Sequence, residues 1–192
     1  MANEFKRDNL LFSLCGLNCS LCPLFVRKEC TGCIEDSMCY KICFLATCSI
    51  EHGGRDYCFE CGEYPCDKYE GIEDHDSLIT HINQKIDMEK AQKIGIEKYN
   101  EEQSKKVEIL HKFLENYNPD NNKEVFFCTA VNLLPLDDLT DISNGLDDAT
   151  SGMSLKEKYD YLKNQLFECG DNHNIKIELR KGKYNEEKIS FE

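Results

Sequence analysis

The sequence predicts an α+β fold in which a cysteine-rich, metal-bound domain of loops and short helices precedes helices and a small α/β C-terminal part. Eleven of the thirteen cysteines lie between Cys15 and Cys66. Apolar residues then recur at helical spacing through the middle of the chain. Near the end, aliphatic residues alternate with charged ones, as in a half-buried strand. We therefore expect one domain over residues 1–72 and a second region over residues 73–192.

The cysteine-rich part offers few signals for regular structure. An apolar run at residues 10–14 leads into the first cysteine. Residues 37–47 are expected to form a short helix with Cys39 and Cys43 on one face, because residues four apart share a face of a helix. Gly53 and Gly54 are expected to end it.

The second region is expected to begin with two helices. Asp76 could cap the first, whose apolar side would carry Leu78, Ile79, Ile82 and Ile86. The second is expected from about Ile96 to Tyr117, burying Val107, Leu110, Phe113 and Leu114. A loop over residues 116–122 follows, with Asn and Pro as its signals.

Residues 124–134 are apolar enough to lie in the core, but their periodicity does not choose between helix and strand. Pro135 should start a short helix through Ile142. A capping box at Ser154-Leu155-Lys156-Glu157 should open another, with Leu155, Tyr159, Leu162 and Leu166 facing inward. The alternation at residues 175–180 predicts an edge strand.

Cysteines in Cys-x-x-Cys pairs indicate metal binding. Three such pairs are present, Cys19/Cys22, Cys30/Cys33 and Cys58/Cys61. One tight turn presents both sulfurs of a pair to a single metal, and a glycine such as Gly32 or Gly62 relieves the left-handed backbone of such turns. With His52 the window supplies twelve donors, enough for three four-coordinate zinc sites or for two with spare thiols. The candidate ligands are Cys15, Cys19, Cys22, Cys30, Cys33, Cys39, Cys43, Cys48, His52, Cys58, Cys61 and Cys66.

Other uses of the cysteines were weighed against zinc. The chain starts without room for a secretory leader, so a cytoplasmic location is expected, where thiols stay reduced. That expectation and the odd number of cysteines argue against disulfides. An iron–sulfur protein using eight cysteines for two [4Fe–4S] clusters stays open, although the compact cysteine run of bacterial ferredoxins is absent.

The charge and hydropathy of the chain argue against nucleic acid and membranes as partners. The net charge is −13, and residues 10–70 carry five Lys or Arg against nine Asp or Glu. Binding to nucleic acid depends on Lys and Arg neutralising phosphates, so it is disfavoured. No apolar run approaches the ~20 residues that span a bilayer, so no membrane partner is expected.

Several residues outside the window are expected to have structural roles only. Cys128 lies in an apolar stretch and is expected to be a buried thiol. Cys169 follows a helix and is expected near its end without a role. Asp138 should cap a helix or face solvent. His75, His81, His111 and His173 have polar neighbours and are expected at the surface.

The window resembles a cysteine-rich family of bacteria and archaea, catalogued as a domain of unknown function and taken to bind zinc. Its pattern, CGxxCxxCP, then CxGC, then CxxCxxxPC, matches residues 15–23, 30–33 and 58–66, and the resemblance extends over nearly the whole chain. Some members carry a further Cys-x-x-Cys-Gly where residues 104–109 here have no cysteine. The resemblance implies metal binding and no particular activity. Its members occur often in anaerobes, which keeps iron–sulfur chemistry open.

Together these patterns favour two or three structural Zn²⁺ ions in sites made wholly or mostly of thiolates. Such sites would fold residues 10–70 and present a surface to a protein or small-molecule partner. Fully ligated zinc has no open position for hydrolysis, so a non-enzymatic role is favoured. An enzyme with its site between the two halves stays a weaker alternative.

Overall fold

The computed structural model describes residues 5–35 and 37–180, and within them the protein is helical. The cysteine-rich part holds the short helices α1 (Pro23–Val26) and α2 (Phe44–Glu51). They are accompanied by the 3-10 turns η1 (Cys19–Leu21) before α1, η2 (Tyr40–Ile42) between the two helices, and η3 (Cys58–Glu60) and η4 (Asp67–Tyr69) after α2. The remainder is built from the longer helices α3 (Gln84–Ile94), α4 (Ile96–Asn116), α5 (Glu124–Leu133), α6 (Leu136–Ala149) and α7 (Leu155–Asn172), with the turn η5 (Pro119–Asn121) after α4.

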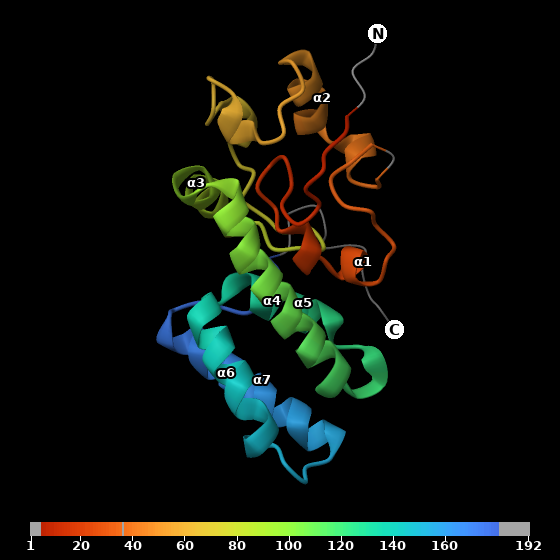
Figure 1. Ribbon diagram of the computed structural model, residues 1–192, viewed down its shortest axis with the longest axis vertical. Coiled ribbons are helices and arrows are strands. Elements are labelled where there is room, and N and C mark those ends of the chain that lie inside the picture. Colours follow the sequence, from red (N-terminus) through yellow and green to blue (C-terminus); the bar gives the residue numbers. More distant parts are fainter. Residues whose placement is uncertain (1–4, 36, 181–192) are drawn as a thin grey trace.

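Helix α4 joins the two parts. Figure 1 shows it running from the cysteine-rich part, beside α3, down to the helices α5, α6 and α7. It is amphipathic, and its inward face buries Tyr99, Leu110 and Phe113 completely. The expected helix over residues 96–117 is therefore confirmed.

The larger core lies among α4, α5, α6 and α7. Phe113, Phe127, Val131, Leu139 and Leu162 are among its fully buried members. Helix α5 is buried on all sides from Phe127 to Leu133, which explains why residues 124–134 lack a polar face and why periodicity could not assign them. Leu21, from the cysteine-rich part, also packs in this core, so the two parts share apolar contacts. The boundary at residue 72 stays a prediction.

The α+β prediction is wrong, because the described residues contain no β-strand. Residues 175–180 form neither helix nor strand, and the Glu178 amide donates to the Lys176 carbonyl at 3.1 Å. Ile175 and Ile177 pack against the helical core, which accounts for their alternation with charged neighbours. Arg180, at the end of this segment, is held by Asp76. The Asp76 amide donates to the Arg180 carbonyl at 3.0 Å, and the Asp76 carboxylate binds the Arg180 guanidinium at 2.9 Å. Because no neighbouring strand among the described residues pairs with this segment, the alternation of aliphatic and charged residues reflects only that one side of it packs against the core.

Some expected helix boundaries are also wrong. The helix expected over residues 37–47 breaks at Cys43, which separates η2 from α2. Helix α3 begins at Gln84, because the Asp76 carboxylate accepts from the His81 amide and from Arg180 instead of capping a helix at residue 77. Helix α6 continues seven residues beyond Ile142, to Ala149.

Other local predictions are confirmed. The left-handed Gly53 and Gly54 follow the end of α2. Ser154 caps α7, and Glu157 completes the capping box. Leu162 and Leu166 are buried as expected, but Leu155 is 45% exposed. No described helix combines the length and the apolar character needed to cross a membrane.

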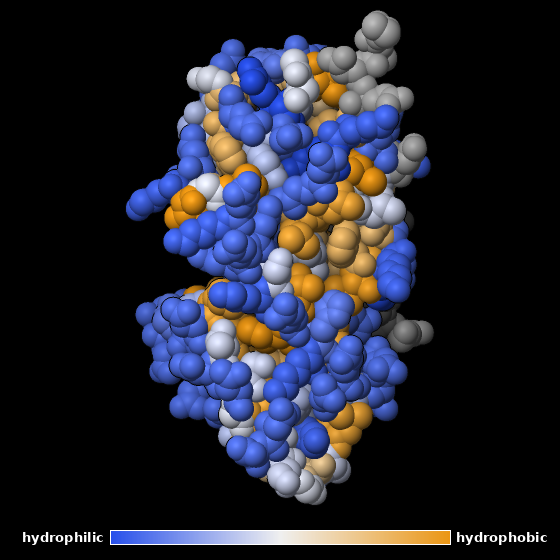
Figure 2. Space-filling view, viewed as in Figure 1, coloured by the Kyte–Doolittle hydropathy of each residue, from blue (hydrophilic) through white to orange (hydrophobic). Residues whose placement is uncertain are grey.

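The surface is mainly hydrophilic on the face drawn in Figure 2, with hydrophobic residues grouped near the middle of the molecule, where the cysteine-rich part meets the helices.

Candidate metal centres

Two of the three Cys-x-x-Cys pairs adopt the same local structure. Cys19 and Cys58 each start a 3-10 turn, and the amides of Cys22 and Cys61 donate to their carbonyls at 3.0 Å. In the third pair Gly32 has a φ of 94° and its amide lies 3.5 Å from the Cys30 sulfur. Gly32 thus relieves a left-handed backbone as expected. Gly62 does not, since its φ is outside that region.

Seven of the eleven cysteines surround one apolar cavity of about 270 Å³. They come from the segment before η1, from η1 and the residue between η1 and α1, from the loop after α1, and from the two residues that flank η2. Aliphatic and aromatic side chains, including Phe5, Leu24, Phe25 and Ile79, complete the lining. The seven are Cys15, Cys19, Cys22, Cys30, Cys33, Cys39 and Cys43. We call this the large cavity.

The other four cysteines line a second cavity of about 30 Å³, which we call the small cavity. These are Cys48, Cys58, Cys61 and Cys66. His52 lies at the same cavity, at the end of α2, with its Nδ1 3.8 Å from the Cys61 sulfur. A volume near 30 Å³ is the share of one water molecule in the liquid, so the space suits a single small ion.

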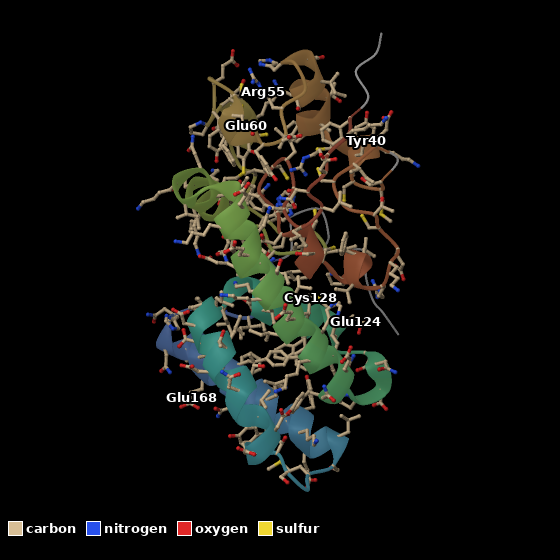
Figure 3. The ribbon with its side chains drawn as sticks, viewed as in Figure 1. Tyr40, Arg55, Glu60, Glu124, Cys128 and Glu168 are labelled. Carbon is tan, nitrogen blue, oxygen red and sulfur yellow. The ribbon has the colours of Figure 1, made fainter. Side chains whose placement is uncertain are left out.

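The two cavities are neighbours divided by a thin layer of protein. Leu14 lines the small cavity, and the next residue, Cys15, lines the large one. In α2, likewise, Leu45 lines the small cavity and Ala46 the large one. Figure 3 labels one lining residue of each, Tyr40 for the large cavity and Arg55 for the small one, on different sides of the cysteine-rich part. The sequence could not show this division, because sequence neighbours contribute to different cavities.

The sulfur atoms are spread more widely than the ligands of one zinc ion. A zinc held tetrahedrally at about 2.3 Å keeps its four sulfurs about 3.8 Å apart. Among the described residues, no three cysteines of the window have sulfurs within 4.8 Å of one another. A [4Fe–4S] cluster places iron and sulfide between its thiolates and therefore needs wider spacing. This spacing holds at both cavities, so volume separates them: the large cavity has room for such a cluster, whereas the small cavity has room for one ion, around which its four sulfurs would have to close.

Burial makes these cysteines poor thiolates by themselves. Burial, followed by the charge of Cys33, raises the pKa of Cys15 to about 12, and burial raises that of Cys58 to about 12. Burial also raises the pKa of Cys19 well above its usual value. A bound cation would offset this cost, because coordinated thiols lose their protons outright.

Arg7 supplies positive charge beside the large cavity. Burial raises the pKa of Cys33, and the Arg7 guanidinium opposes that rise. Arg7 is itself 7% exposed, donates to the carbonyls of Asp56 and Phe12, and stacks over the Tyr57 ring. Its Nη2 is buried without a hydrogen-bond partner among the described residues. This donor fits a neighbouring thiolate or cluster sulfide, since charge-assisted hydrogen bonds stabilise both.

A buried polar network holds the loop between Cys15 and Cys19. Asn18 donates to Asp87 of α3 at 2.8 Å and to Asn132 of α5 at 3.0 Å, and accepts from Tyr99 of α4 at 2.9 Å. The Gln84 side chain donates to the Cys15 carbonyl at 3.0 Å. The helices thereby position the first cysteines. Sequence analysis missed this network because its members lie up to 114 positions apart and follow no motif.

The comparisons with known proteins found no matching family model, no matching curated protein and no matching solved structure.

The cysteines outside the window differ from one another. All thirteen cysteines are free thiols. Cys128 is buried in the helical core, as expected. Cys169, expected to have no role, lies beside Asp138 and His173, a grouping that the sequence analysis did not predict.

Proposed function

We propose that this protein binds metal through two neighbouring thiolate centres: an iron–sulfur cluster in the large cavity and one zinc ion in the small cavity. The observation that carries this proposal is the division of eleven cysteines between two cavities of very different volume. Seven donors around the large cavity exceed the four that a [4Fe–4S] cluster takes. The four cysteines around the small cavity equal in number the ligands of a structural zinc site, and their sulfurs would move closer together on binding the ion.

The chemistry follows from the surroundings of each centre. A cluster supplies single-electron transfer, and its apolar lining and the buried Arg7 would tune its potential. A zinc ion with four thiolates has no open position and would act by holding the chain in place. Exposed Met38 and Ile42 at the large cavity offer an apolar contact for a partner protein that exchanges the electron.

A second candidate is the zinc scaffold without iron. The Cys-x-x-Cys turns at Cys19 and Cys58 favour it, because paired turns of this kind are typical of structural zinc. In that case the large cavity would contract around one or two zinc ions and the protein would present a surface to a partner.

The test is metal analysis of protein purified without oxygen. We expect a brown protein that bleaches on reduction, with iron and acid-labile sulfide in equal amounts and one zinc per chain. Cys33→Ser should lose iron and colour but keep zinc, whereas Cys61→Ser should lose zinc and keep the colour. Cys128→Ala, which removes a buried thiol that lines neither cavity, is the control and should keep both metals.

Two other results would overturn this assignment. A colourless protein with two or three zinc ions and no sulfide would establish the zinc scaffold instead. A chain that purifies without metal, and takes up neither zinc nor iron with sulfide, would refute metal binding at both cavities.

A further inference from the structure

Three metal-ligating side chains meet outside the cysteine window. Cys169 and His173 lie four residues apart at the end of α7, so they share one face of the helix. Asp138 lies in the first turn of α6, which packs against α7. One ligand atom of each residue lies within 4.8 Å of the other two. This is closer than any three sulfurs of the window come within the described part of the chain.

The distances need little adjustment to hold an ion. The His173 Nε2 and the Asp138 Oδ2 are 3.0 Å apart. Ligands at about 2.0–2.3 Å in a tetrahedron are roughly 3.3–3.8 Å apart, so an ion fits after small rotations of the exposed histidine and aspartate. Cys169 is only 7% exposed, so its side chain is held in place by packing beneath the two more exposed ligands. An ordinary surface Asp–His pair would not need this thiol beneath it.

The electrostatics of the place favour a cation. The group lies in an open cavity of about 210 Å³ that is also lined by Asp141 and Glu168. Among the described residues, that lining contains no Lys or Arg. The C-terminal end of α7 adds the negative end of the helix dipole, which attracts cations.

We propose that Asp138, Cys169 and His173 form a third metal site, suited to zinc rather than to magnesium or calcium, with one coordination position open to the cavity. Sulfur, imidazole nitrogen and carboxylate oxygen are the three donor types that zinc accepts, whereas magnesium and calcium avoid sulfur. Three protein ligands with an open fourth position are the arrangement of zinc sites that bind water or a small ligand. The site is independent of the two thiolate centres, so it stands whichever metals they hold.

The test adds Zn²⁺ to the protein as purified, with the centres of the window filled. We expect one further zinc per chain by equilibrium dialysis. Alkylation of Cys169, followed by mass spectrometry of its peptide, should slow at least tenfold when zinc is present. His173→Ala and Asp138→Asn should remove both effects while leaving the metals of the window in place.

A matched control separates a defined site from general attraction to acidic groups. Glu168→Gln removes a carboxylate from the same cavity without changing the three ligands. It should bind the additional zinc as the wild type does. The proposal is refuted if zinc does not protect Cys169, or if Glu168→Gln lowers binding as much as Asp138→Asn does.

Discussion

Replacing Tyr99 with Phe tests whether the helices hold the cysteine-rich loop in place. The Tyr99 side chain is fully buried, and its hydroxyl donates to the Asn18 Oδ1 at 2.9 Å. Without that hydroxyl, the Asn18 carbonyl oxygen loses this buried hydrogen bond. Such a loss costs about 1–3 kcal/mol. For a chain of this size, a loss of about 2 kcal/mol lowers the Tm by roughly 4–8 °C.

The assay is thermal unfolding of the metal-loaded protein, followed by circular dichroism. Tyr159→Phe is the control, because the Tyr159 ring packs on Phe126 and Phe127 while its hydroxyl makes no hydrogen bond among the described residues. We expect a chelator to remove metal faster from Tyr99→Phe, since Asn18 lies between Cys15 and Cys19. If Tyr99→Phe is no less stable than Tyr159→Phe, the network does not hold the loop.

Two further substitutions probe the same junction. In Gly16→Ala the new Cβ would overlap the Met88 side chain and the Gln84 carbonyl, at a φ of 97° that disfavours side chains. We expect a loss of at least about 3 kcal/mol in urea unfolding and a loss of bound metal. Gly62→Ala, with open space around it, should change neither. Burial raises the pKa of Asp87 to about 6, so the folded state binds this proton more tightly than the unfolded state and wild-type stability falls as pH rises from about 4 to about 6. Asp87→Asn should remove this part of the pH dependence, on the order of 2–3 kcal/mol, in urea titrations at pH 4.5 and 7; an unchanged difference between those pH values would contradict the assignment.

Much of the helical part could be predicted from local signals. The spacing of Leu110, Phe113 and Tyr117 identified α4, and the Ser154 capping box identified the start of α7. These signals are reliable because they depend on residues within one or two helical turns. The alternation at residues 175–180 misled, because a strand requires a partner and sequence cannot show that none is near.

The sequence alone identified the side chains of the window that could hold metal. Each Cys-x-x-Cys pair is a local structure in which one short turn carries both sulfur donors. Only the tertiary structure decided how those donors divide. Cys43 and Cys48 lie on one short stretch of chain but line different cavities, because different faces of α2 turn towards the two cavities. It also joined Cys169 and His173 to Asp138, 31 and 35 positions away in the chain. Such contacts depend on how whole helices pack, and no short stretch of sequence contains that information.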